Sequence, residues 1–221
     1  MALSEHRQTL QDLKQPDPFF EAMGDAREYF AKNRSLVIAA GTAVVVLLTS
    51  VVGVGRYYQS QSERAATDFS AAVSSLEFES PSAAEVALAH VAERSNAGPY
   101  VALSELYRGD IAASAGRNDE AIAAFDKFLT APPTEYAKQI GLMGKAFALE
   151  NAGKAADAAA TLELAAAIKG PYRKAALSDR ARLAEEAGDK AAASTNLTLL
   201  LEIEGSGPGA ADVERRLQAL K

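Results

Sequence analysis

Residues 116–128 read GRNDEAIAAFDKF, and the spacing of small and large side chains in this stretch recurs twice further along the chain. In each copy an alanine follows a glycine by five residues, and a large apolar residue follows the alanine by four. The three copies are Gly116, Ala121 and Phe125; Gly153, Ala158 and Leu162; and Gly188, Ala193 and Leu197. A period of about 34–37 residues, with a glycine turn between two helices, is typical of helical-hairpin arrays.

Three tyrosines share this period, because Tyr100, Tyr136 and Tyr172 are spaced 36 and 36 residues apart. A single hairpin is too small to bury its own apolar face, so neighbouring hairpins stack and share a continuous core. The small alanine after each turn lets two helices approach closely, and the larger residue one turn later fills the layer between them. The sequence therefore predicts a solenoid of about four hairpins.

The whole chain is predicted to be all-α. Alanine is frequent, β-branched residues are sparse after residue 57, and no segment alternates with a period of two. Glycine and proline mark the helix ends. The predicted helices span 57–78, 81–95, 100–115, 118–130, 134–151, 155–168, 172–187, 190–204 and 210–220, and the last is expected to cap the array with its charged face.

Residues 35–55 read SLVIAAGTAVVVLLTSVVGVG and contain no charged side chain, while Arg34 and Arg56 flank them. A helix needs about 20 apolar residues to cross a bilayer. A cleaved signal peptide is the alternative, but its apolar region is usually about 7–15 residues long and closer to the N-terminus. The sequence therefore predicts one uncleaved transmembrane helix over 35–55.

The charges beside this span predict its orientation. Arg27, Lys32 and Arg34 precede it and only Arg56 and Arg64 follow it closely, so the positive-inside rule places residues 1–34 in the cytoplasm. Those residues form a short arm with a juxtamembrane helix. The domain of residues 56–221 is then expected in the periplasm of a Gram-negative cell, anchored in the inner membrane.

Composition argues against several classes of function. The net charge of −6 is unfavourable for nucleic-acid binding, and the lack of cysteine excludes disulfides and thiol chemistry. The histidines, His6 and His90, have no third ligand at metal-binding spacing, and no nucleophile–base pair or phosphate loop is evident. We expect no catalytic, cofactor or metal site and no small-molecule substrate, so the chain is not predicted to be an enzyme.

Three cations occupy equivalent places in the repeats. Arg108, Lys145 and Arg180 each lie eight residues before a turn glycine, so stacked hairpins would align them along the array. One interpretation is a cationic strip that binds acidic segments of protein partners. The alternative is that each cation offsets a nearby carboxylate.

Apolar side chains on the first helices form the second candidate surface. These are Leu103, Leu106, Tyr107, Ile140, Met143 and Phe147. If exposed, they would make an adaptable groove for protein partners, to which methionine is well suited. The alternative is that they belong to the core. The residues predicted to contact partners are Leu106, Tyr107, Arg108, Met143, Lys145, Phe147 and Arg180.

Residues 116–128, followed by Pro133, resemble the second half of a tetratricopeptide repeat, and residues 153–165 and 188–200 resemble degenerate copies. The resemblance implies a tetratricopeptide-like solenoid whose first helices line a concave, protein-binding side. The chain departs from the family at Arg108, Lys145 and Arg180, where the family usually has a large apolar residue.

A narrower resemblance rests on the order of segments. An aromatic and basic helix (Tyr29, Phe30, Lys32) runs into a single span, followed by RYYQS at 56–60, an alanine-rich helix and hairpins with Pro-Tyr at helix starts. This order resembles the YfgM-type ancillary subunits of the SecYEG translocon. The resemblance implies a periplasmic adaptor that associates with the translocon and a membrane-anchored chaperone and helps pass exported proteins to periplasmic chaperones. A scaffold subunit of another envelope assembly complex is the alternative.

Overall fold

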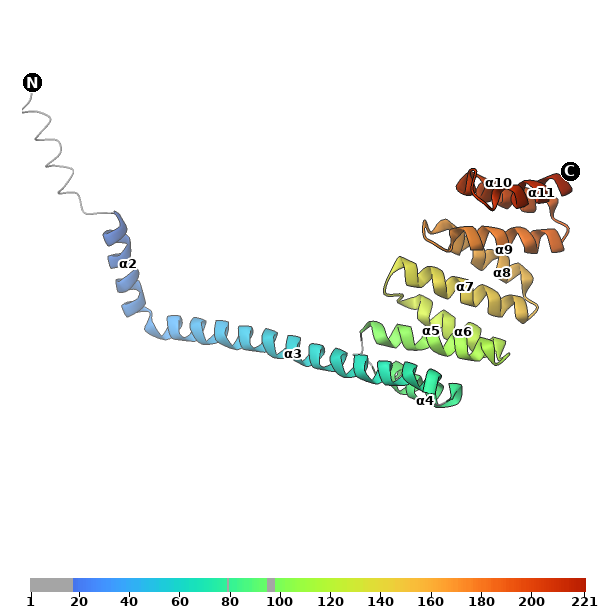
Figure 1. The fold of residues 1–221 in the computed structure, drawn as a ribbon. Helices are drawn as coiled ribbons and strands as arrows, with labels where there is room; N and C mark the ends of the chain where they lie inside the picture. Colours follow the sequence, from blue (N-terminus) through green and yellow to red (C-terminus); the bar gives the residue numbers. More distant parts are fainter. Residues whose placement is uncertain (1–17, 79, 95–97) are drawn as a thin grey trace, which may run out of the picture. The chain divides into compact units, whose positions relative to one another are not determined.

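The computed structural model describes residues 18–78, 80–94 and 98–221 (Figure 1). All regular secondary structure in these ranges is α-helical, as the sequence predicts. The helices are α2 (Pro18–Lys32), α3 (Arg34–Phe78), α4 (Pro81–Ala92), α5 (Pro99–Ser114), α6 (Asn118–Thr130), α7 (Glu135–Asn151), α8 (Ala155–Ala167), α9 (Arg173–Glu186), α10 (Lys190–Glu204) and α11 (Ala210–Ala219).

The chain divides into two units, Met1–Tyr57 and Tyr58–Lys221. Within the described part of the first unit, α2 is followed by the N-terminal part of α3. Helix α3 continues without a break through the boundary, because no proline interrupts residues 34–78. Its apolar stretch is long enough to span a membrane, and the side chains there are exposed, as Leu47 illustrates. Residues 1–17 of the predicted arm, including His6, lie outside the described residues.

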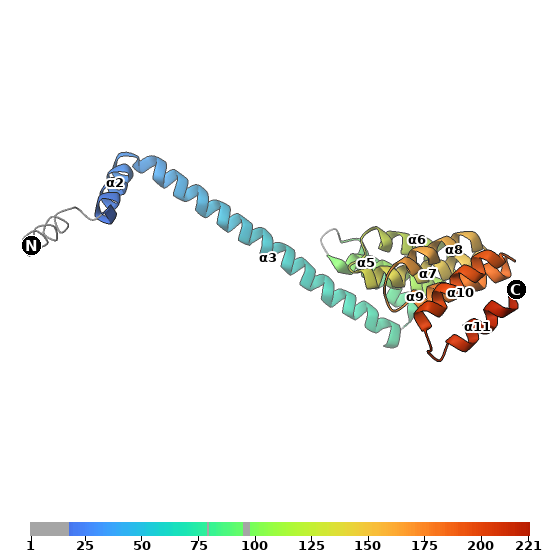
Figure 2. The same ribbon diagram turned by 90° about the horizontal axis from the view of Figure 1, so that it is seen from above.

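The second unit is a stack of helical hairpins: α5 with α6, α7 with α8, and α9 with α10 (Figure 1). Each hairpin packs on the next through its second helix, so α6 contacts α7 and α8 contacts α9. The end of α3 and helix α4 share a small core with α5. Helix α11 packs beside α10 and closes the array (Figure 2). Its Val213 is buried in the core that α7, α8, α9 and α10 share.

The predicted glycine turns are present in all three hairpins. Gly116 ends α5 with a φ of +74°, a left-handed conformation that glycine adopts without a steric penalty. Its N–H donates to the carbonyl oxygen of Ala113, and the N–H of Arg117 donates to that of Ala112. This is the Schellman pattern of helix termination. The same pair of bonds recurs at Gly153, which explains the repeated turn.

The alanine and large apolar residue of each repeat are buried, as predicted, and the ring of Phe125 is fully enclosed. Two glycines make this enclosure possible. A Cβ on Gly109 would lie 2.7 Å from the ring of Phe125, and a Cβ on Gly144 would lie 2.6 Å from it. Close packing of α5 and α7 around one aromatic ring therefore accounts for both glycines.

A buried glutamine holds the loop between α8 and α9. The Gln139 side-chain amide donates to the carbonyl oxygens of Ala165 (3.0 Å) and Ile168 (3.1 Å) and accepts from the N–H of Tyr172 (3.2 Å). These backbone groups lie where α8 ends and the regular helical hydrogen bonds stop. The two carbonyl oxygens each accept one further backbone N–H, from Ile168 and Gly170. Gln139 thereby joins one hairpin to the next.

Candidate protein-interaction surface

The first helices of the hairpins carry a repeated pair of positions, counted back from the turn glycine. The minus-six position holds Asp110 on α5, Phe147 on α7 and Arg182 on α9. The minus-three position holds Ala113, Glu150 and Glu185 in the same order. Because the hairpins stack, the minus-three residue of one helix lies near the minus-six residue of the next.

These positions are joined by ion pairs in the C-terminal half of the array. Arg182 donates to Glu150 across the α7–α9 boundary at 2.7 Å and to Glu186 at 2.8 Å. These two hydrogen bonds raise the pKa of Arg182 above its usual range. Arg216 on α11 binds both carboxylate oxygens of Glu185, at 3.2 and 3.0 Å. Two consecutive links of the same kind thus connect α7, α9 and α11.

The N-terminal half lacks such a pair. Between α5 and α7 the equivalent positions hold Ala113 and Phe147, and the Phe147 side chain is 57% exposed. Asp110 is also exposed, and within the described residues its carboxylate has no hydrogen bond or ion pair. Along the first helices, the surface therefore changes from paired charges to an exposed aromatic ring and an unpaired carboxylate.

A cavity of about 590 Å³, here called the first hollow, opens beside Asp110 at the ends of α3, α4 and α5. Its apolar walls include Leu76, Tyr107 and Ile111. Although Asp110 as a residue is exposed, burial of its carboxyl group beside these walls raises its pKa. Glu85 lines the other side, and its hydrogen bond from Arg117 lowers its pKa.

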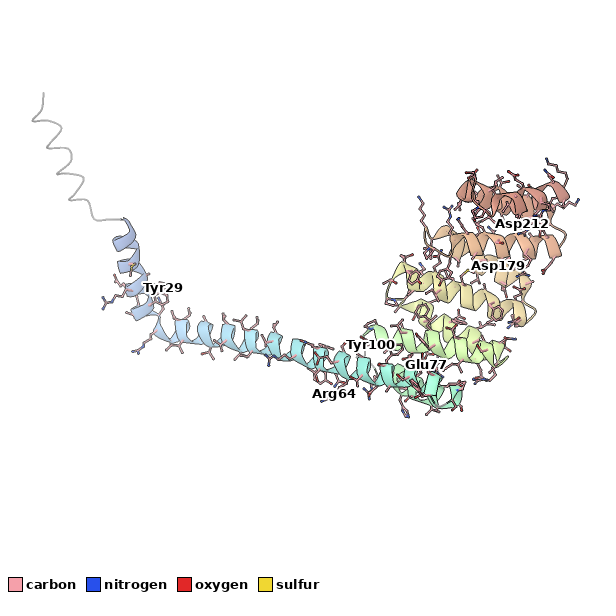
Figure 3. All side chains as sticks on the ribbon, in the orientation of Figure 1. Tyr29, Arg64, Glu77, Tyr100, Asp179 and Asp212 are labelled. Atoms are coloured by element: carbon pink, nitrogen blue, oxygen red, sulfur yellow. The ribbon has the colours of Figure 1, made fainter. Side chains whose placement is uncertain are left out.

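A smaller cavity of about 370 Å³, here called the second hollow, lies between α7 and α9. Met143 and Phe147 form its apolar side, and Asp179 lies at the α9 side, where Figure 3 labels it. Burial raises the pKa of the Asp179 carboxyl, and Arg182 opposes this shift. The Glu150–Arg182 ion pair borders the same hollow.

The structure separates the apolar candidates into buried and exposed groups. Leu106 on α5 is buried in the core, which agrees with the alternative that it packs inside the array, and its contact with a partner stays a prediction. Tyr107 packs its ring edge-on against Phe69, with centroids 5.5 Å apart, and still lines the first hollow. Met143 is partly buried, whereas Phe147 is exposed. Of the four, Tyr107, Met143 and Phe147 are accessible through a hollow.

Each of the three aligned cations has a carboxylate partner. Arg108 donates to Glu105 at 3.1 Å, Lys145 on α7 pairs with Asp126 on α6 at 2.6 Å, and Arg180 on α9 pairs with Glu163 on α8 at 2.5 Å. A row of carboxylates thus accompanies the row of cations. This arrangement agrees with the alternative of local charge compensation, and partner binding by these cations stays a prediction.

The described residues offer no grouping of three His, Cys, Asp or Glu side chains that could hold a metal ion. His90 is exposed on α4.

Five charged residues of this surface were not among those predicted from the sequence: Asp110, Glu150, Arg182, Glu185 and Arg216. Counting back six and three residues from each turn glycine identifies the first four of them, and this signal is present in the sequence. The prediction used the cations eight residues before the glycine and the apolar residues of the first helices, and did not consider charged residues at these two positions.

No protein-family model matches the chain, and no curated protein matches its sequence. Solved structures do match. A tetratricopeptide repeat protein from Parabacteroides merdae superposes with a TM-score of 0.60 at 16% identity, covering 72% of this chain and 60% of that one. This chain therefore spans less than two thirds of that protein's length.

The nearly identical TPR-like repeats of a Podosopora anserina protein described as a putative kinesin light chain superpose with a TM-score of 0.55, at 16% identity. The match covers 71% of this chain and 85% of that one, and a single-substitution form of the same repeats gives a TM-score of 0.54 at 17% identity. At these identities the likeness concerns the fold. The fold is tetratricopeptide-like.

Proposed function

We propose that this protein is a membrane-anchored adaptor at the site of protein export in the Gram-negative envelope. Its hairpin domain would lie in the periplasm and its N-terminus in the cytoplasm. There it would associate with the Sec translocon and a membrane-anchored chaperone, and would help pass exported proteins to periplasmic chaperones.

The exposure of Phe147 is the observation that carries this proposal. The equivalent positions on α9 and α11 hold arginines that are paired with glutamates, so an aromatic ring at this place is not required by the stack. An exposed aromatic side chain beside Met143 and a hollow gives a partner a large apolar contact. Binding at such a surface needs no catalytic group, so we propose a non-enzymatic role.

The apolar stretch of α3 supplies the second element of the proposal. A membrane anchor confines the hairpin domain to the bilayer surface and so raises its effective concentration near any partner in the same membrane. Tethering of this kind can promote transfer of an exported protein without high affinity for it.

Copurification from native membranes in mild detergent, with crosslinking and mass spectrometry, tests the proposal. We expect crosslinks between residues 56–64 and translocon subunits, together with a periplasmic chaperone. A preparation that contains a different envelope complex and no translocon would support the alternative of a scaffold subunit elsewhere in the envelope.

The membrane anchor has its own test. We expect the protein to remain in the membrane pellet after carbonate extraction, because residues 35–55 carry no charge. Leu47→Arg places a cation near the middle of the stretch, at a cost of about 2.5–3.5 kcal/mol for insertion, and should release a substantial fraction. Extraction of the unaltered protein by carbonate would contradict the anchored form of the proposal.

A further inference from the structure

The first hollow differs from the rest of the array in its balance of charge. In the ion-paired half, Arg182 and Arg216 each meet a glutamate of the preceding first helix. The equivalent residue on α5 is Asp110. Helix α3 contributes Leu76 to the same hollow. A carboxylate therefore stands where α9 and α11 have a cation, and no described cation faces it from the preceding first helix.

The cation that does line the hollow is already engaged. Arg117 donates to Glu85 at 3.1 and 2.7 Å and to Glu120 at 2.7 Å. Among the residues that line the hollow, Asp110 and Glu85 contribute two carboxylates and Arg117 one guanidinium. Arg108 also acts on Glu85 through its charge, but it is itself hydrogen-bonded to Glu105. The hollow thus has an acidic excess next to an apolar wall.

We infer that the first hollow binds a basic and apolar segment of a protein partner. The Lys or Arg side chain of that segment would pair with Asp110, and an adjacent apolar side chain would fill the space beside Leu76, Tyr107 and Ile111. Charge complementarity selects this occupant, because a cation completes the acidic edge whereas an acidic segment would be repelled by it. The inference rests on the proposed adaptor function and names the chemistry of the segment that the adaptor holds.

The absence of cysteine provides a direct reporter for this binding. Ser114 is exposed and lines the hollow, so Ser114→Cys gives a single labelling site in the full-length protein. An environment-sensitive fluorophore at this site should shift its emission when an apolar side chain enters. The labelled protein is reconstituted in lipid nanodiscs for the titrations.

Two peptides of equal length serve as probes, each with Gly and Ser flanks. One has leucine–lysine–leucine at its centre, and the other has leucine–glutamate–leucine. We expect the lysine peptide to bind about tenfold more tightly, which is the usual scale for a charge-assisted contact. Asp110→Asn should abolish this preference, and Asp110→Lys should reverse it. Glu202→Gln, which removes one exposed carboxylate from α10, should leave it unchanged.

Equal binding of the two peptides, or a preference that survives Asp110→Asn, would overturn the inference. A fluorescence shift that depends on protein concentration without peptide would do so as well, since it would assign the hollow to a second copy of the chain. The titration contains no translocon. Its failure therefore leaves the copurification test of the proposed function untouched, and loss of the translocon association leaves the peptide result standing.

Discussion

The guanidinium of Arg182 on α9 lies 2.7 Å from a carboxylate oxygen of Glu150 on α7, two residues 32 positions apart in the chain. One hairpin later Arg216 meets Glu185 at 3.0 Å. The corresponding place between α5 and α7 holds Ala113 and Phe147 instead. One repeated position therefore joins consecutive first helices in one half of the array and leaves an exposed ring in the other.

Glu150→Gln tests the energetic contribution of this link. Because both side chains are about a third exposed, we expect the free energy of unfolding to fall by about 0.5–1 kcal/mol. The loss should shrink in about 1 M NaCl, where charges are screened. Urea unfolding of Glu150→Gln, Arg182→Gln and the double variant at two salt concentrations measures it. If the two single effects simply add, the residues are not coupled and the link is absent in solution.

Gly144→Ala tests the packing of α5 and α7 around Phe125. On helix propensity alone alanine would stabilise α7 by about 1 kcal/mol. Its Cβ would meet the Phe125 ring at 2.6 Å, so we expect a net loss of about 1–3 kcal/mol instead. Thermal unfolding monitored by circular dichroism distinguishes the two outcomes. Phe125→Leu in the same chain should reduce the penalty of Gly144→Ala, and a stabilised Gly144→Ala protein would show that the two helices are further apart.

Gln139→Leu tests the polar link between the hairpins. Leucine has a similar size but leaves the carbonyls of Ala165 and Ile168 and the N–H of Tyr172 without this partner. We expect a loss of about 1–3 kcal/mol, the usual cost of one unpaired buried polar group. The Tyr172 N–H loses its acceptor, whereas the two carbonyl oxygens still accept from the N–H groups of Ile168 and Gly170. Hydrogen exchange should accelerate at the Tyr172 amide in particular. Gln139→Glu keeps one acceptor and serves as the comparison, and unchanged exchange in Gln139→Leu would argue against the link.

Asp110→Asn tests the environment of the unpaired carboxylate through its pH dependence. Burial raises the pKa of Asp110 in the folded state above its ordinary value of 3.8. The folded state then binds the proton more tightly, so the stabilising contribution is present below the unfolded pKa and is lost as the pH rises through the folded value. We expect Asp110→Asn to be more stable than the unaltered protein at about pH 7 and to show no such advantage near pH 3. A destabilised Asp110→Asn protein at neutral pH would instead reveal a stabilising partner for the carboxylate.

Local features of the fold follow from the sequence. The turn glycines and the alanines five residues later predict where the hairpins lie. Each glycine allows a left-handed turn, and each buried alanine allows two helices to pack closely. Helix bounds agree within a few residues, although α4 ends at Ala92 where a helix to 95 was predicted. The predicted helix 57–78 is the C-terminal part of α3, which begins at Arg34.

The interaction surface was harder to predict, for a physical reason. Which residues of successive helices meet depends on how the hairpins are rotated against each other, and single-helix periodicity does not contain that rotation. Leu106 was predicted at the surface and is buried, while Phe147, predicted from the same pattern, is exposed. The contacts of Gln139 were also beyond prediction from sequence, because they depend on where the end of α8 places its carbonyl groups.

The most direct test of the adaptor account is site-specific photocrosslinking in living cells at two positions of the full-length protein. A photoreactive residue replaces Phe147 on the proposed interaction surface, and in a second strain it replaces Glu202 on α10. We predict crosslinks to translocon subunits, exported proteins or their chaperones from position 147 and few from position 202. Equal crosslinking from both positions, or none of these partners from position 147, would contradict the account.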